Sequence, residues 1–276
     1  MPADAAPAFV WVPEVAPPGA MQTLATDDAH YVARVCRARE GDRVTLTDGR
    51  GGLARARVVS SGKSVKLEIE SFDPGAPLPG GAWVLCGAPE GTRADWLVEK
   101  LAELGVAVLQ PVDTARATWE ARGGRLERWE RLATAALRQS QRRHRLEVRA
   151  PRPLAEVLDD LPPGSEPAPA SAGLSAPASA GVSGGGGRYV ADPDGAPAAG
   201  IAAPSTGWTV GAVGPAPGFS PEESAALAGA GFRAMALSDG RLRTETAALA
   251  WASWWASGRV RPPSSPSGPT ADPERS

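Results

Sequence analysis

The 276-residue sequence predicts an α/β protein in which a small β domain precedes a larger domain built on a parallel sheet. Three observations indicate this fold class. Residues 43–70 alternate apolar and polar side chains with the period of half-exposed strands, whereas the apolar runs from Ala82 onward are continuous. A linker rich in proline and glycine, residues 74–81, separates the two patterns. We therefore place the domains at residues 1–74 and 82–258.

The first domain has the pattern of a hairpin followed by a further strand. Residues 43–47 and 54–58 alternate on either side of the turn-forming sequence Asp48–Gly52, and residues 64–70 alternate again. One short helix is expected before them, at about residues 27–39.

The second domain begins with a strand–helix–strand unit. Ala82–Cys86 is a continuous apolar run, and residues 106–111 form another. Between them, residues 94–104 place leucines on one helical face, and Gly105 can end that helix. This spacing predicts a βαβ unit and a parallel sheet.

A basic helix is expected next, at residues 125–143. Residues 116–152 hold eleven arginines and four glutamates, although the whole chain has a net charge of only −2. On the helix, one stripe opposite the apolar face consists of Arg128, Arg131, Arg138 and Arg142. The stripe is either a solvated face or a contact for phosphates, and we favour phosphates because no glutamate shares it. Alanine at positions 138 and 142 is then expected to weaken binding to a polyanion and to flatten the salt dependence of that binding.

Two segments are too poor in apolar residues to build a core. Residues 161–187 are almost entirely Pro, Ala, Ser and Gly, and a similar tail covers residues 259–276, so both are expected to be disordered. Strands are expected again at 188–191, 208–213 and 232–237. The sequence has no run of 18 apolar residues and no signal-peptide pattern, which favours a soluble, cytoplasmic protein without a membrane partner. Cys36 and Cys86 belong to no metal-binding motif.

Two loops near the C-terminus follow expected strands and precede expected helices. After Gly214–Phe219, Ser220 can cap a helix that has Pro221 at its first position and Glu223 in a capping box. After residues 237–243, Thr244 can cap the last helix. Ligands of open α/β sheets bind at this end of the strands, so the two loops could form one ligand site.

The last helix carries Trp251, Trp254 and Trp255 on one face. This spacing suits either packing within the domain's own core or a homodimer interface, because aromatic residues concentrate at both. The sequence leaves these alternatives open.

The ordered parts of the chain resemble the RsmE family of ribosomal RNA methyltransferases. The resemblance includes His30–Arg37 with Gly41-Asp42, then Gly91–Trp96, Glu99–Val106, Arg128-Trp129, Gln139-Ser140 with Arg142, Val213–Pro215 and Leu242–Ala247. It implies a PUA-like β-barrel followed by a SPOUT domain with a C-terminal trefoil knot. It also implies a homodimer that uses S-adenosylmethionine to methylate N3 of a uridine in 16S ribosomal RNA, free or within the small ribosomal subunit, with no metal.

The resemblance assigns residues to three tasks. The methyl donor is expected to contact Val213, Gly214, Pro215, Gly218, Leu237, Ser238, Leu242, Thr244 and Thr246. Catalysis is expected to depend on Arg243, which would stabilise the uridylate, and on Glu245, which either orients the site or only favours the helix dipole. Ribosomal RNA is expected to contact Arg34, Arg37, Arg39, Arg93, Arg116, Arg128, Arg131, Arg138 and Arg142.

Two loops depart from the family pattern. The usual Gly-Pro-Glu-Gly-Gly is Gly214–Gly218 with Ala216 and Pro217, and the usual Leu-Gly-x-Arg is Leu237–Gly240. These changes motivate an alternative, an RNA-binding protein on a SPOUT scaffold that has lost methyl transfer. A dinucleotide-dependent oxidoreductase is disfavoured because no Gly-x-Gly-x-x-Gly follows an early strand.

Overall fold

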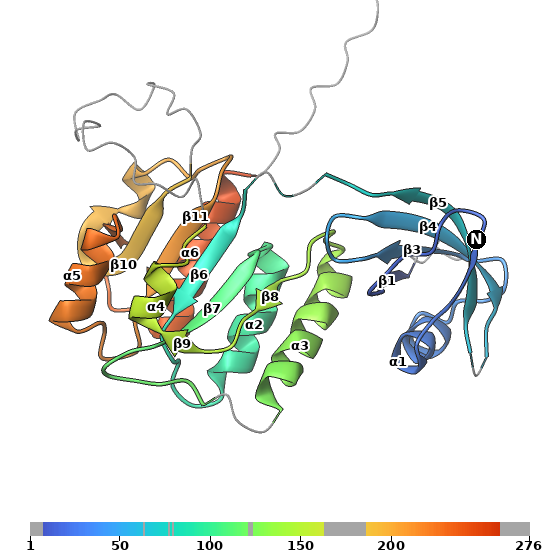
Figure 1. Cartoon of the computed structure of the whole chain (residues 1–276), viewed down its shortest axis with the longest axis horizontal. Helices are drawn as coiled ribbons and strands as arrows, with labels where there is room; N and C mark the ends of the chain where they lie inside the picture. The colour runs from blue at the N-terminus through green and yellow to red at the C-terminus, as the bar shows by residue number, and fades with distance from the viewer. Residues whose placement is uncertain are drawn as a thin grey trace, which may run out of the picture.

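The computed structural model describes residues 8–62, 64–76, 78, 80–120, 124–162 and 186–259. Most of the insertion expected at 161–187, and all but the first residue of the tail expected at 259–276, lie outside the described residues. Figure 1 shows two units side by side, with the N-terminal unit at the right and α3 (Arg125–Ser140) next to it.

The N-terminal unit is a five-stranded sheet. Its strands run in the order β1-β3-β4-β5-β2, and the expected hairpin is confirmed as the antiparallel pair β3–β4. Asp48 closes its turn, because Oδ1 accepts hydrogen bonds from the backbone N–H groups of Arg50 at 2.7 Å and Gly52 at 2.9 Å. The strands are β1 (Phe9–Trp11), β2 (Met21–Thr23), β3 (Arg43–Thr47), β4 (Leu53–Ser60) and β5 (Lys66–Asp73).

The helix of this unit is shorter than the sequence predicts. It consists of α1 (Thr26–His30) and a π-helical turn, Tyr31–Val35, so its end lies before residue 39. Arg37 has φ +55°, a left-handed conformation that a right-handed helix cannot continue through. The backbone N–H of Arg39 then binds Asp42 Oδ2 at 2.7 Å instead of a helical carbonyl.

The larger unit is built on a parallel sheet, as the sequence predicts. Its order is β12-β10-β11-β6-β7-β8, with β9 also paired to β7, and each of these pairings is parallel. The strands are β6 (Ala82–Cys86), β7 (Val108–Asp113), β8 (Glu147–Val148), β9 (Arg152–Pro153), β10 (Arg188–Pro197), β11 (Thr209–Val213) and β12 (Arg233–Ala236).

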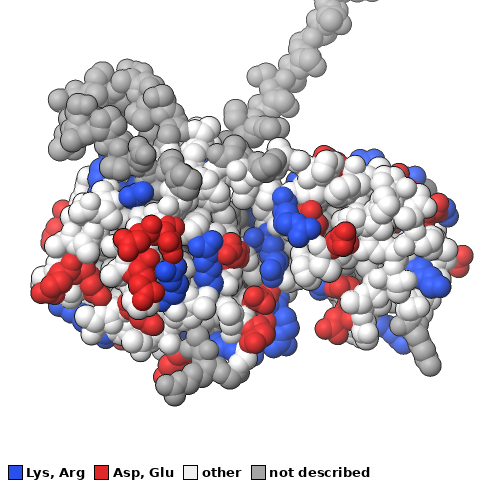
Figure 2. Space-filling model, in the orientation of Figure 1, with Lys and Arg blue, Asp and Glu red and all other residues white. Residues whose placement is uncertain are grey.

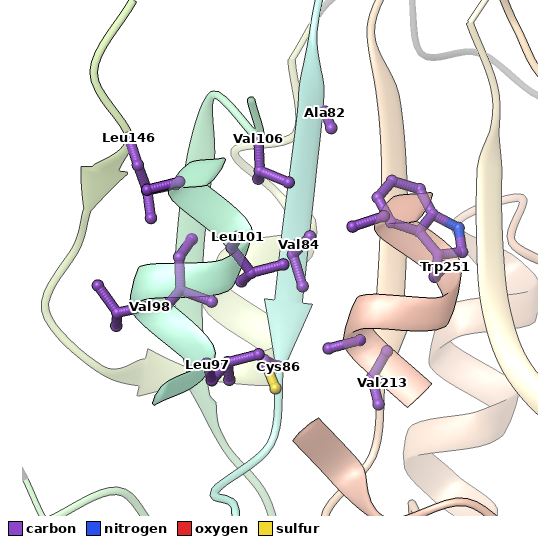
Figure 3. Packing of buried hydrophobic residues seen from close by; sticks show 14 of the residues in the cluster. Ala82, Val84, Cys86, Leu97, Val98, Leu101, Val106, Leu146, Val213 and Trp251 are labelled. Atoms are coloured by element: carbon purple, nitrogen blue, oxygen red, sulfur yellow. The ribbon is translucent and has the colours of Figure 1, made fainter. Parts of the chain in front are cut away.

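Helices cover both faces of this sheet, and β6 shows why its sequence is apolar throughout. Ala82, Val84 and Cys86 pack toward one helical layer, whereas Trp83 and Leu85 pack toward the other. Figure 3 shows residues of the first layer. In this view Leu97 and Leu101 lie to the left of β6 and Trp251 lies to its right, and all three belong to the same core cluster. That layer holds α2 (Arg93–Leu104), α3 and α6 (Thr244–Ser257), and the second layer holds α4 (Leu154–Leu158) and α5 (Pro221–Gly229).

The tryptophans of α6 pack within their own chain. Trp251 and Trp255 are buried in the core. Trp254 is half-buried, lies edge-on to Tyr189 with a centroid separation of 5.0 Å, and donates from Nε1 to the carbonyl of Ile201 at 3.0 Å. Core packing therefore accounts for the aromatic face of α6.

The C-terminal end of the basic helix joins the two units. Arg138 forms an ion pair with Asp28 of α1, and its guanidinium lies 5.1 Å from the centroid of the Tyr31 ring. Beyond the helix, Arg143 Nη1 contacts Asp73 Oδ2 at 2.9 Å. Arg145 lies 5.3 Å from the centroid of the Trp11 ring. Several charges of the basic segment are thus used between the units, and Figure 2 shows acidic and basic side chains interspersed on the visible face.

Candidate functional site

A cavity of about 630 Å³ lies at the carboxyl ends of the parallel strands β11 and β12 and beside the middle of β10, which pairs with both. The two loops that the sequence singles out both line it: the segment after β11, which includes Gly214 and Pro215, and the segment after β12, which includes Ser238 and Leu242. Parallel pairing brings the ends of these strands to one edge of the sheet, and ligands of open α/β sheets bind at such edges. The cavity has the size of a small-molecule site.

The first loop ends at a well-defined helix start. Ser220 accepts a hydrogen bond from the Glu223 backbone at 3.2 Å, and the Glu223 side chain accepts one from the Ser220 backbone at 2.8 Å. Pro221 begins α5, so the expected capping box is confirmed. Before it, Gly218 has φ +78°, and its N–H donates to the Pro215 carbonyl at 2.7 Å, which closes a tight turn.

Thr244 joins the two loops instead of capping the last helix. Its Oγ1 donates to the Gly214 carbonyl at 3.0 Å. The N-cap position belongs to Arg243, which makes no side-chain cap, so the expected capping by Thr244 is wrong. Thr244 lies one position too late to cap α6, because it is already the first residue of the helix. Its hydroxyl instead holds the two cavity walls together.

Most residues that the sequence assigns to a methyl donor lie around this cavity. Thr246 is exposed on α6 and is not among the lining residues. The lining residues from the expected set are Val213, Gly214, Pro215, Gly218, Leu237, Ser238, Leu242 and Thr244.

Sequence reasoning missed a third wall of the cavity. It comes from the middle of β10 and includes Asp192 and Pro193, and the two known loops also contribute Phe219 and Arg241. The predicted strand at residues 188–191 was the available signal. In a parallel sheet, the residues that follow this strand lie at the same edge as the two loops, so they could have been expected at the ligand site. No motif marks those residues as ligand-binding.

The two expected catalytic residues have different surroundings. Arg243 is exposed and is not among the residues that line the cavity, and within the described residues no hydrogen bond or ion pair engages its guanidinium. Glu245 is buried and does not line the cavity. Its Oε1 lies 2.5 Å from Arg93 Nη1 of α2, so the pair connects α6 to α2. Burial raises the pKa of the nearby Cys86 thiol, and the charge of Glu245 raises it further.

The arginines expected at RNA separate into two groups. Arg34, Arg37 and Arg39 are exposed on the N-terminal unit, and Arg131 is exposed on α3. The others have partners in other segments of the chain, although Arg116 and Arg128 are exposed as well: Arg93 with Glu245, Arg116 with the Pro217 carbonyl, Arg128 with Asp95, Arg138 with Asp28, and Arg142 with the Glu103 carbonyl.

Within the described ranges, no group of three or more His, Cys, Asp or Glu side chains could hold a metal ion. In the same part of the chain, the helices are too short or too polar to cross a membrane.

Comparison with known domain families finds two matches. A family described as RNA methyltransferase domain matches residues 76–256, and one described as RNA methyltransferase PUA domain matches residues 24–70. These matches, with the two sheets described above, confirm the expected α/β fold with a preceding PUA-like β domain. The trefoil knot stays a prediction.

Individual relatives are similar over different lengths. Ribosomal RNA small subunit methyltransferase E of Synechocystis is 32% identical over 139 residues, which are 50% of this chain and 45% of that protein. The chain thus matches about half the length of that relative. The protein of the same name from Mycobacterium tuberculosis is 29% identical over 238 residues, covering 83% of this chain and 84% of its own length.

A solved structure shares the architecture of nearly the whole chain. The ribosomal RNA small subunit methyltransferase E of Neisseria gonorrhoeae, bound to S-adenosyl methionine, superposes with a TM-score of 0.73 at 27% identity. The superposition covers 89% of this chain and 95% of that one.

Proposed function

This chain belongs to the RNA methyltransferase domain family, and from that premise we propose that it transfers a methyl group from S-adenosylmethionine to small-subunit ribosomal RNA. The observation that carries the proposal is the cavity of about 630 Å³ formed by the loops after β11 and β12. Its relatives named as small-subunit rRNA methyltransferases support the substrate class. A relative of the same fold that binds S-adenosyl methionine supports the donor.

The residues around the cavity fit a donor of this size and chemistry. Open space lies where side chains at Gly218 and Gly240 would begin, so backbone can approach a ligand closely there. Leu237, Leu242 and Phe219 supply apolar walls. We propose that these residues, together with Gly214 and Pro215, hold the donor. A volume of several hundred Å³ is typical of sites for such molecules.

The bound donor would supply a sulfonium methyl group to a nucleophilic nitrogen. The chain has to hold the acceptor base in line and keep water away, and the loops joined by the Thr244–Gly214 hydrogen bond give a rigid support for this positioning. The acceptor base must leave its stack to enter a cavity beside a sheet edge.

We propose N3 of a uridine as the acceptor atom. This nitrogen carries a proton at neutral pH, so the site has to stabilise the anion that forms when the proton leaves. Arg243 lies between two cavity-lining residues, Leu242 and Thr244, and its guanidinium has no partner in the described chain. Such a charge stabilises developing negative charge on the uracil ring. Glu245 is committed to Arg93, so we assign it to positioning the N-terminus of α6.

The proposed role of Arg243 in stabilising the uracil anion can be tested separately from donor binding. Arg243→Ala is expected to lower kcat by about 10²-fold, because one stabilising donor at a developing anion has an effect of that order. The dissociation constant for S-adenosylmethionine should change little. Equal losses in donor affinity and kcat would place Arg243 in the donor site and refute its assignment to the acceptor.

For the RNA surface we propose the exposed arginines Arg34, Arg37, Arg39 and Arg131, with the N-terminal unit as the main contact. We also propose that the protein acts in the cytoplasm as a homodimer. A candidate contact residue is Trp96 on α2, whose side chain stays 47% exposed in the single chain. Trp96→Glu is expected to shift the mass measured by analytical ultracentrifugation toward the monomer, and an unchanged mass would exclude Trp96 from the interface.

The alternative function is that of an RNA-binding protein without methyl transfer, and it differs from the proposed function because it requires no binding of the methyl donor. Calorimetry with S-adenosylmethionine separates the two, because the alternative predicts no binding by the well-folded protein. Activity is then tested by incubating small-subunit rRNA with protein and methyl-labelled donor and by locating the product by mass spectrometry. Product at another atom than uridine N3 would refute that assignment while leaving rRNA methylation intact. Absence of product on both free rRNA and small subunits would refute the activity.

A further inference from the structure

Two arginines from outside the altered loop hold its backbone. Arg116 Nη1 donates to the Pro217 carbonyl at 2.7 Å, and Arg241 Nη2 donates to the Ala216 carbonyl at 2.5 Å. Arg116 follows β7, whereas Arg241 follows β12, so the two guanidiniums approach from separate parts of the chain. They bind the two consecutive peptides at the positions where the sequence departs from the family pattern.

The loop needs such external support because its own backbone offers few hydrogen bonds. Pro215 and Pro217 have no N–H group. Inside the turn, the Gly218 N–H binds the Pro215 carbonyl at 2.7 Å. The Pro217 carbonyl and the Gly218 N–H belong to one planar peptide and point in opposite directions. By binding that carbonyl, Arg116 therefore also fixes the direction of the Gly218 N–H.

The segment that carries Arg116 is itself fixed to the start of α5. The Ala115 N–H donates to Glu223 Oε1 at 2.8 Å, while Glu223 Oε2 accepts from the Ser220 N–H at 2.8 Å. On its other side, Thr114 and Ala117 form an isolated bridge. Arg116 thus starts from a backbone position that is already ordered, which reduces the conformational entropy lost when its side chain binds the loop.

We propose that Arg116 and Arg241 are positioning residues that hold the Gly214–Gly218 loop in the geometry required by the methyl donor. The two arginines thereby add hydrogen bonds to a loop in which Pro217 removes a backbone donor. Arg116 does not line the cavity and acts only through the loop, whereas Arg241 also lines it. The proposal rests on the proposed function for the identity of the donor.

The decisive measurement is the affinity for S-adenosylmethionine by calorimetry. Arg116→Ala is expected to raise the dissociation constant roughly tenfold, as for the loss of one hydrogen bond from a charged donor. Arg116→Lys retains one charged donor and should recover most of that loss. Arg125→Ala is the matched control, since Arg125 is an exposed arginine at the start of α3 and contacts Glu120 instead of the loop. Its donor affinity should match the wild type.

Kinetics and RNA binding distinguish positioning from other effects. Arg116→Ala should raise KM for the donor with a much smaller change in kcat, and Arg241→Ala should do the same. The double variant is expected to lose less donor affinity than the two single variants lose together, because both residues hold one loop. The salt dependence of rRNA binding should stay unchanged. A lower salt slope with normal donor affinity would make Arg116 a phosphate contact and overturn the proposal.

Loop order can be measured without any donor. Hydrogen exchange of the Gly218 amide should be faster in Arg116→Ala than in the wild type and in Arg125→Ala. Equal exchange rates, or wild-type donor affinity in both alanine variants, would overturn the proposal. Failure of the wild type to bind the donor would instead overturn the proposed function, and it would be seen before any variant is compared.

Discussion

The ion pair between Arg138 and Asp28 allows a sharp test of how the basic helix is used. Their side chains are 19% and 10% exposed, and they connect α3 to α1 across the junction of the two units. Arg138→Ala would leave the Asp28 carboxylate in this poorly hydrated position without its partner. The resulting loss of folding stability shows whether Arg138 has a structural role or is free to contact RNA.

The expected loss follows from burial. Removing one partner of a buried pair destabilises by about 3–5 kcal/mol, and the residual exposure here places the expected value at about 3 kcal/mol. Replacing both partners, with Asp28→Leu and Arg138→Met, should change stability far less, because the desolvation cost of both charges disappears with their attraction. The pair therefore predicts a large coupling energy in a double-mutant cycle.

The pH dependence has a definite sign. Burial raises the pKa of Asp28 above its ordinary value of 3.8, the charge of Arg138 lowers it in part, and Asp27 raises it again. A carboxyl group with a raised pKa favours the folded state most below pH 3.8, and it loses that contribution as pH rises through the pKa of the folded protein. Without Arg138 the pKa should rise further. The destabilisation by Arg138→Ala should therefore be larger at neutral pH than in acid.

Urea unfolding, followed by circular dichroism and tryptophan fluorescence, measures these free energies. Arg131→Ala is the control, because Arg131 lies exposed on the same helix and its Nε makes only a 3.4 Å contact with the Glu127 carbonyl. Its change should stay within about 0.5 kcal/mol. For rRNA binding we expect the opposite ranking of the two variants. Arg131→Ala should reduce by about 1 the slope of log binding constant against log salt concentration, whereas Arg138→Ala should leave this slope unchanged.

Two results would refute this reasoning. An Arg138→Ala variant as stable as Arg131→Ala would show that the junction does not depend on the pair. A salt slope that falls in Arg138→Ala, with stability retained, would return Arg138 to the RNA surface.

Three further perturbations follow from the site and the junction. Arg93→Ala leaves buried Glu245 unpaired and should lower the free energy of unfolding by about 3 kcal/mol in denaturant titrations, with recovery when Glu245→Gln is added. Ser220→Ala removes the cap of α5 and should reduce stability by about 1 kcal/mol, whereas exposed Ser253→Ala should not. Burial lowers the pKa of His144, so its contribution to stability is present above pH 6.5 and is lost as pH falls through the folded value. His144→Gln should flatten that acid-side loss in thermal unfolding scans; an unchanged profile would exclude His144.

Local patterns in the sequence predicted the two sheets of the chain and several of its helix ends. The change from alternating to continuous apolar runs identified the two kinds of sheet, because side-chain period reflects whether one or both faces of a strand are covered. The capping box at Ser220 and the closure of α2 at Gly105 depend on residues within one helical turn, and both are confirmed. The position of two loops at one sheet edge likewise predicted where the cavity lies, although not its walls from β10 and α5.

The partners of charged and hydroxyl side chains were decided only by tertiary structure. A periodic stripe shows which face Arg138 shares, but its partner Asp28 is 110 residues away. Separation along the sequence also hides the contacts of Glu245 with Arg93, of Thr244 with Gly214, and of Arg116 with Pro217. Side-chain period and capping are local properties of the chain, whereas the choice of a charge's partner depends on which distant segments folding brings within hydrogen-bond reach.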